Sequence, residues 1–194
     1  MISAIVLAAG NSQRMGIENK MLLPFRGTTI ISTVLQQLEH SEVNEIILVT
    51  GLDKKIIEEI NDGANKIKVV VNEQANEGLT SSIQCGIKAA NNSAKGFLIC
   101  LGDMPLLTSE DYNLLNNKLL NTNTKQILTP VKNFKKGNPV VFSCHFKNEI
   151  LQLKYQGGCK PIVLENEEYV KEVEVFNNHF FVDIDTPEDF QIIV

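Results

Sequence analysis

The sequence predicts a doubly wound, three-layer α/β/α sandwich whose mixed sheet is mostly parallel. Two observations support this fold class. Short β-rich segments alternate with segments of helical periodicity along all 194 residues, which is the pattern of repeated βαβ units. The strand-like segments are apolar at almost every position, as in Gly96–Leu101 (GFLICL), and such strands are buried on both faces of a parallel sheet. Ligands of these folds bind at the carboxyl ends of the strands.

The predicted strands are continuous apolar segments that stop at glycine or at polar residues. In chain order they span Ser3–Leu7, Glu45–Thr50, Ile67–Val71, Gly96–Leu101, Ile127–Pro130, Pro139–Ser143, Val173–Phe176 and Phe180–Ile184. The first runs into Gly10 and a polar loop with no basic stretch before it, so it is interpreted as a strand rather than a signal peptide. No apolar segment approaches the roughly 20 residues of a membrane span. We therefore expect a cytoplasmic protein with no membrane partner.

The predicted helices repeat apolar residues three and four positions apart, as Ile30, Val34 and Leu38 do in the first of them. In chain order they span Thr29–Leu38, Lys54–Ile60, Thr80–Ala90, Ser109–Leu120, Lys147–Leu153, Pro161–Glu168 and Thr186–Ile193. In the last helix Thr186 should be the cap and Pro187 the first helical residue. At roughly 150 residues per domain, residues 1–194 should form one domain.

Composition excludes several classes of function. Asp plus Glu outnumber Lys plus Arg by 23 to 18, giving a formal net charge of −5, which argues against nucleic acid as the main partner. The four cysteines form no CxxC pair, so no zinc or redox signature is present. His40, His145 and His179 are expected at the surface or at helix caps, and no Ser/His/Asp or Cys/His catalytic set is indicated.

The first strand is followed directly by the loop Leu7–Gly16 (LAAGNSQRMG). Small residues over Ala8–Gly10 let a ligand approach the backbone, and free N–H groups in such a loop can hold phosphate. Arg14 supplies a bidentate fork and Lys20 a point charge, which together suit a polyphosphate. The loop matches neither the Walker A nor the GxGxxG pattern. Phosphate binding is the favoured interpretation, and a turn with solvated charges is the alternative.

Acidic residues follow the buried segment Gly96–Leu101 and recur near the end of the chain. Asp103 would lie at the carboxyl end of a central strand, beside the phosphate loop, where it could hold Mg²⁺. On the residues alone, an Asx turn that ends the strand is the favoured interpretation, and a metal ligand is the alternative. Asp183 and Asp185 alternate along an extended segment and point to opposite sides, so only one can readily face the same ion as Asp103. Asp189 is expected in the first turn of the last helix, where its charge complements the helix dipole.

Two further segments carry polar groups that a ligand could use. Gly78 permits close approach to the backbone, and Thr80–Ser82 offers hydroxyl and N–H groups at a helix N-terminus. On spacing alone, a plain helix cap is the favoured interpretation of this segment. Lys135–Gly137 forms a small basic loop. A solvated turn is the favoured interpretation, and a loop that attracts an anionic acceptor is the alternative.

Together these segments resemble the signature of the MobA/MocA-like nucleotidyltransferases, most closely the molybdenum cofactor cytidylyltransferase branch. The resemblance is carried, in order and spacing, by Leu7–Gly16 with Lys20 and Leu22–Pro24, and by Gly78–Ser82, Gly102–Pro105, Gly137–Pro139 and Asp183–Asp189. It covers nearly the whole chain and implies a Rossmann-like nucleotidyltransferase fold.

The resemblance implies Mg²⁺-dependent transfer of a nucleotidyl group from an NTP to the phosphate of molybdopterin, with release of pyrophosphate. CTP is the expected NTP, because Ala9 stands where guanylyl-transferring relatives usually carry Gly. A phosphate nucleophile is already ionised near neutral pH, since its second pKa is about 6, so no strong general base is required. A molybdoenzyme would be a transient partner.

The resemblance also assigns roles to residues of this sequence. The catalytic residues are Arg14, Lys20 and Asp103, and the metal ligands are Asp103 and Asp185. The nucleotide-binding residues are Leu7, Ala8, Ala9, Gly10, Arg14, Lys20, Gly78, Ser81, Ser82 and Asp103. Two departures from the family pattern occur: Gly16 and Lys20 are one residue further apart than in many close cytidylyl relatives, and Thr80 stands where Ser is frequent.

Two other functions stay open. A cytidylyl- or uridylyltransferase acting on a sugar or polyol phosphate would share the opening loop, although such enzymes are usually longer or carry different late motifs. A nucleotide-binding regulator would bind the NTP without turnover. Pyrophosphate release with CTP, Mg²⁺ and molybdopterin separates these alternatives from the molybdopterin enzyme.

Overall fold

The computed structural model describes residues 1–10, 19–52, 55–58, 66–121 and 124–193. A mixed sheet runs through its centre in the order β10-β7-β9-β6-β1-β4-β5, with β8 paired to β7. The strands are β1 (Ile2–Ala8), β4 (Glu45–Thr50), β5 (Ile67–Val71), β6 (Gly96–Leu101), β7 (Ile127–Lys132), β8 (Lys135–Lys136), β9 (Val140–Ser143) and β10 (Val170–Glu174), and β2 (Pro24–Phe25) and β3 (Thr28–Thr29) form a separate hairpin. Within the order given, β9 pairs antiparallel with β6 and β7, and the other pairs are parallel.

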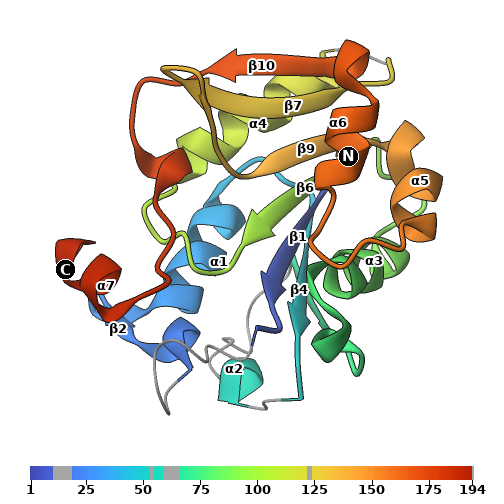
Figure 1. The fold of residues 1–194 in the computed structure, drawn as a ribbon. Helices are drawn as coiled ribbons and strands as arrows, with labels where there is room; N and C mark the ends of the chain where they lie inside the picture. Colours follow the sequence, from blue (N-terminus) through green and yellow to red (C-terminus); the bar gives the residue numbers. More distant parts are fainter. Residues whose placement is uncertain (11–18, 53–54, 59–65, 122–123, 194) are drawn as a thin grey trace.

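Helices cover both faces of this sheet (Figure 1). One layer holds α1 (Ile30–His40) and α4 (Ser109–Leu120), and the other holds α3 (Leu79–Ala89), α5 (Lys147–Gln152) and α6 (Lys160–Glu165). At the edge of the molecule, α7 (Pro187–Ile193) lies beside β2, and α2 (Lys55–Glu58) is a short helix after β4. The predicted three-layer sandwich with a mostly parallel, mixed sheet is confirmed. None of the described helices is long and apolar enough to cross a membrane.

The central strand β1 explains why its sequence is apolar throughout. All seven of its residues are buried. Ala4 and Val6 pack with the α1 and α4 layer, whereas Ile5 and Leu7 pack with the α3 layer. Because successive side chains of a strand point to opposite faces, a strand covered by helices on both sides needs apolar residues at every position.

Gly86 in α3 marks a close approach of helix to sheet. A Cβ at this position would lie 2.3 Å from Ile5 Cγ2 and 3.0 Å from Val49 Cγ2. Glycine-to-alanine changes stabilise exposed helices by about 1 kcal/mol, but here the added carbon would push α3 away from β1 and β4. We expect Gly86→Ala to lower the free energy of unfolding by about 1–3 kcal/mol, as measured by urea denaturation.

The matched control for this prediction is Lys88→Ala, because Lys88 is an exposed residue of the same helix. It should change the free energy of unfolding by no more than about 0.5 kcal/mol. A Gly86→Ala protein as stable as the wild type would contradict the packing of α3 described above.

The predicted strand Phe180–Ile184 is wrong. The structure has a 3₁₀ helix there, His179–Phe181, with Phe180 fully buried. Two asparagines produce the turn: Asn177 Oδ1 accepts a hydrogen bond from the His179 N–H (3.1 Å), and the Asn178 carbonyl accepts one from the Phe181 N–H (3.0 Å). Asparagine favours such local turns because it satisfies backbone groups that a strand would leave for a neighbour.

His179 has a structural partner in the cap of α4. Its Nδ1 lies 2.8 Å from Asp111 Oδ2, and Asn177 Nδ2 donates to Asp111 Oδ1 (2.8 Å). Asp111 also closes a capping box with Thr108 at the start of α4. Burial alone would raise the pKa of Asp111, but hydrogen bonds from Thr108, His179 and Asn177 outweigh it and lower that pKa. His179 therefore fastens the segment before α7 to α4.

Candidate active site

Three side chains from distant parts of the sequence meet at the carboxyl ends of β1 and β6. Lys20 Nζ lies 2.6 Å from Asp103 Oδ2 and 2.8 Å from Asp185 Oδ1. Lys20 begins a 3₁₀ helix, Lys20–Leu22, after the opening loop, and Asp103 follows β6. One ammonium group thus bridges two carboxylates, and we call this group the Lys20–Asp103–Asp185 cluster. It brings together three of the predicted catalytic and metal-binding residues.

The fold fixes each carboxylate of this cluster by backbone contacts. The Gly102 N–H donates to the Leu7 carbonyl (3.1 Å), which joins the end of β6 to that of β1. The Ile184 N–H donates to the Asp103 carbonyl (3.1 Å), and the Ile184 side chain is fully buried. Asp185 therefore lies beside Asp103 because the residue before it is anchored in the core.

Asp189 holds Asp185 from the other side. Its Oδ2 accepts hydrogen bonds from the backbone N–H groups of Asp185 (3.1 Å) and Thr186 (2.8 Å). The Asp189 N–H in turn donates to Thr186 Oγ1 (3.2 Å), which completes a capping box at the start of α7. Hydrogen bonds from Thr186 and Asp185 lower the pKa of Asp189. Asp189 is thus a capping residue in the first turn of α7 that also positions the neighbouring carboxylate.

Burial and charge act in opposite directions within the cluster. Burial would lower the pKa of Lys20, but the carboxylates of Asp103 and Asp185 outweigh it and raise that pKa. Burial raises the pKa of Asp103, Lys20 opposes the rise, and nearby Asp183 adds to it. Lys20 thus remains a cation, while the negative charge of Asp103 is only partly compensated.

The donor set of the cluster fits a divalent cation that also binds a triphosphate. Asp103 Oδ1 is buried and has no hydrogen-bond partner among the described residues. A buried carboxylate oxygen in that position costs free energy unless a cation or donor approaches it. The described residues contain no cluster of three or more His, Cys, Asp or Glu side chains that could hold a metal. Mg²⁺ commonly binds one or two carboxylates and completes its shell with phosphate oxygens and water.

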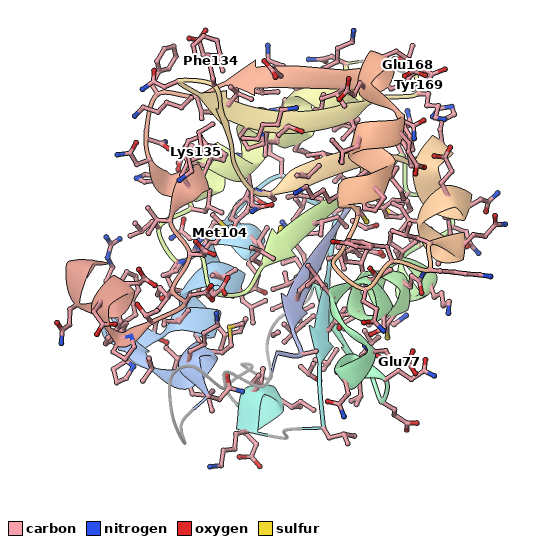
Figure 2. The ribbon with its side chains drawn as sticks, in the orientation of Figure 1. Glu77, Met104, Phe134, Lys135, Glu168 and Tyr169 are labelled. Atoms are coloured by element: carbon pink, nitrogen blue, oxygen red, sulfur yellow. The ribbon has the colours of Figure 1, made fainter. Side chains whose placement is uncertain are left out.

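A cavity of about 290 Å³ adjoins the cluster. The predicted site residues that line it are Leu7, Ala9, Gly10, Lys20, Gly78, Ser82 and Asp103. Figure 2 labels Met104, the residue after Asp103, and Glu77, the residue before Gly78. The cavity therefore lies between the end of β6 and the start of α3, beside the start of the opening loop.

Other predicted site residues lie elsewhere. Ala8 is buried in the core on the α1 face of the sheet. Ser81 Oγ lies 2.8 Å from the carbonyl oxygens of both Gln74 and Gly78, either of which can accept its one O–H group, and Ser81 is outside the cavity lining. Arg14 lies outside the described residues.

Position 78 requires glycine, because its φ is positive and the backbone of Gln156 passes close to its Cα. Its φ is +104°, and a Cβ there would lie 2.6 Å from the Gln156 carbonyl oxygen. Thr80, the departure from the family pattern, fastens the same segment: its Oγ1 donates to the Tyr155 carbonyl and accepts from the Gly158 N–H (3.0 Å). Residues 155–158 are thereby held against the N-terminus of α3.

The sequence analysis missed Asn72, which lies outside the cavity lining but contacts Ser82, one of the lining residues. Asn72 is buried at the end of β5, and its Nδ2 donates to Ser81 Oγ (2.9 Å) and Ser82 Oγ (3.0 Å). Its Oδ1 accepts from the Gln74 N–H (3.0 Å). Asn72 thus orders the turn that leads into α3 and orients Ser82 beside the cavity. The available signal was its place directly after a parallel strand, where polar residues gather in this fold class.

Comparison with known proteins gives the family. The pattern of the MobA-like NTP transferase domain matches residues 4–170. Molybdenum cofactor cytidylyltransferase of Escherichia coli is 29% identical over 97% of this chain and 93% of its own. A nucleotidyl transferase from Methanothermobacter superposes with a TM-score of 0.83 at 25% identity, covering 100% of this chain and 95% of that one. Rv0371c of Mycobacterium tuberculosis, in complex with manganese, superposes with a TM-score of 0.78 at 21% identity, covering 99% and 97%.

The family match spans most of the chain and includes β1, β6 and the helix α3 that line the cavity. The similar structures share its architecture from end to end. The chain belongs to the MobA-like NTP transferase family and is a nucleotidyltransferase.

Proposed function

We propose that this protein transfers a cytidylyl group from CTP to the phosphate of molybdopterin and releases pyrophosphate, with Mg²⁺ as the metal ion. One observation carries the proposal. Lys20 Nζ lies within 2.8 Å of both Asp103 and Asp185, beside a cavity that the residues Ala9 and Gly10 also line. A cation, two carboxylates and a small-residue backbone at one strand edge are the groups that a metal-bound triphosphate requires.

In the proposed reaction, Lys20 exchanges its carboxylate partners for phosphate oxygens of the triphosphate. It then neutralises negative charge as the bond between the α-phosphate and the pyrophosphate breaks. The backbone at Ala9 and Gly10 lets the phosphates approach closely, because neither residue carries a large side chain. An acceptor phosphate oxygen attacks the α-phosphate without a general base, because its second pKa is about 6. Orientation and charge neutralisation supply the catalysis.

Asp103 and Asp185 would hold the metal ion. When bound, the ion neutralises the triphosphate and stabilises charge on the departing pyrophosphate. The buried and unpartnered Asp103 Oδ1 supports this role, as does the manganese complex of the mycobacterial relative. Asp185 is preferred over Asp183 as the second ligand, because Asp185 shares the Lys20 ammonium with Asp103.

We prefer molybdopterin as the acceptor and CTP as the nucleotide because of the similarity of this chain to known relatives. The Escherichia coli relative, a molybdenum cofactor cytidylyltransferase, aligns over nearly its whole length. Ala9, which replaces the glycine usual in guanylyl-transferring relatives, lines the cavity and supports the choice of CTP.

A panel of nucleotides tests the proposal. Pyrophosphate release is measured with CTP, GTP, UTP and ATP, each with Mg²⁺ and with molybdopterin, a sugar or polyol phosphate, or no acceptor. We expect release with CTP and molybdopterin together, and little release when either is left out. Release only with a sugar or polyol phosphate would contradict the acceptor assignment. CTP binding without release from any acceptor would instead favour a regulator.

A further inference from the structure

The segment that brings Asp185 to the cluster is a long connection, and we call it the strap. It comprises residues 175–186, which join the end of β10 to α7 and run down one side of the molecule (Figure 1). Because β7 and β9 separate β10 from β6 in the sheet, the strap spans about 14 Å to place Asp185 beside Asp103. These residues, all within the described part of the chain, form no strand. Contacts with other elements must therefore fix the path of the strap.

The core holds the strap at two points before Asp185. Phe180 is fully buried, and its carbonyl accepts a hydrogen bond from the Asn138 N–H (2.9 Å). Further along, Ile184 is fully buried, and its N–H donates to the Asp103 carbonyl (3.1 Å). The strap thus follows one path over the core, and a shift of its middle would move Asp185 relative to Asp103.

Asp111, a residue of α4 that is 6% exposed, fastens the middle of the strap. Its Oδ2 closes the capping box of α4 by accepting the Thr108 N–H (3.0 Å). Its Oδ1 accepts from Asn177 Nδ2, and its Oδ2 also lies 2.8 Å from His179 Nδ1. The capping box uses Oδ2, as it does in Asp189 of α7. The contacts with Asn177 and His179 therefore serve the strap rather than the helix cap.

Asp111 also belongs to the segment that follows Asp103. That segment begins at Met104, which Figure 2 labels, and leads directly into α4. Met104 and Leu107 are each 1% exposed, so the segment is packed into the core. Close-packed interiors transmit small displacements. One buried carboxylate therefore ties together the two segments that present Asp103 and Asp185.

The charge of Asp111 makes its donors necessary. Hydrogen bonds from Thr108, His179 and Asn177 outweigh burial and lower the pKa of Asp111. The carboxylate is therefore ionised near neutral pH and can only accept hydrogen bonds, so His179 Nδ1 carries the proton between them. A buried anion that loses a donor costs free energy. Removing the His179 donor would thus favour a rearrangement of the strap around Asp111.

We propose that Asp111 and His179 are positioning residues for the metal ion, because their contact sets the separation of Asp103 and Asp185. The inference rests on the proposed function, in which these two carboxylates ligate the metal. Both Asp111 and His179 lie outside the cavity lining, so they act through the strap. Groups that orient a metal ligand commonly determine the affinity for the metal. Without the contact, the two carboxylates no longer reach one ion together.

The Mn²⁺ affinity of the nucleotide-free protein, measured by electron paramagnetic resonance, tests this inference. His179→Leu removes the donor and should weaken Mn²⁺ binding about tenfold, the lower end of the usual cost of removing a group that orients a metal ligand. His179→Asn carries an amide N–H₂ group that can replace the Nδ1 donor, and it should restore most of the affinity. A role confined to fold stability would leave the Mn²⁺ affinity of the folded protein unchanged.

Two further variants make the outcome unambiguous. Gly86→Ala is the control for lowered stability, because it acts on α3 in the layer across the sheet, and it should leave Mn²⁺ binding unchanged. Normal Mn²⁺ affinity in folded His179→Leu protein, or an equal loss in Gly86→Ala, would overturn the positioning role. Asp185→Asn should abolish Mn²⁺ binding. If it binds Mn²⁺ as the wild type does, the proposed metal site is wrong and the inference fails with it. Loss with Asp185→Asn but not with His179→Leu overturns the inference alone.

Discussion

Asp103→Asn should lower the rate of pyrophosphate release by about a hundredfold to a thousandfold, the usual cost of removing a group that stabilises transition-state charge. The change keeps the size of the side chain but removes the charge that we assign to the metal ion. It also replaces one anionic Oδ by an amide N–H₂ group, which cannot ligate a cation. The measurement is steady-state release from CTP, Mg²⁺ and molybdopterin.

The fold should survive this change, because asparagine keeps the size of the side chain and Asp185 remains as a charged partner of Lys20. Thermal unfolding followed by circular dichroism checks this expectation. Glu188→Gln serves as the control, since Glu188 is an exposed carboxylate in the first turn of α7, close in sequence to Asp185. A folded Asp103→Asn protein with a nearly normal rate would exclude Asp103 as a metal ligand.

Lys20→Met should change two affinities in opposite directions. CTP should bind about tenfold to a hundredfold more weakly, because a hydrogen bond to a charged group contributes about 1.5–3 kcal/mol. Mn²⁺ should bind more tightly in the absence of nucleotide, because Lys20 now competes for the oxygens of Asp103 and Asp185. Calorimetry with CTP, and electron paramagnetic resonance of Mn²⁺ without nucleotide, measure the two effects.

Lys118→Met is the matched control for this pair of effects. Lys118 is an exposed lysine of α4, and its loss changes the net charge equally. Only a change at the cluster should raise the affinity for free Mn²⁺. Equal Mn²⁺ binding by wild type and Lys20→Met would mean that the lysine and the metal ion do not share these carboxylates.

The sequence predicted the sheet well where burial decides the structure. The predicted bounds of β4, β5 and β6 are those of the structure, since each strand is an apolar segment with a clear end. The α6 to β10 region was predicted less well: α6 ends at Glu165, and β10 begins at Val170 rather than Val173. The edge strand β10 carries exposed charges, as in Lys171 and Glu172, so its apolar signal is weak.

The polar residues of the site could be predicted, but their contacts could not. Residue type and position made Asp103 and Lys20 candidates, and the resemblance to the nucleotidyltransferase family assigned their roles. The choice between Asp183 and Asp185 was open in the sequence, because it depends on the anchoring of Ile184 against Asp103. The contacts of Asn177 and His179 with Asp111 also join segments that are distant in the sequence, which no local pattern encodes.

The most direct measurement is a crystal structure with Mn²⁺ and a CTP analogue that cannot release pyrophosphate. Anomalous scattering locates the manganese without ambiguity. We expect its peak within coordination distance, about 2.1 Å, of Asp103 and Asp185, with triphosphate oxygens completing the shell and Lys20 bound to phosphate. A triphosphate bound away from Asp103, or manganese ligated by other residues while Lys20 still bridges the two aspartates, would contradict the proposed active site.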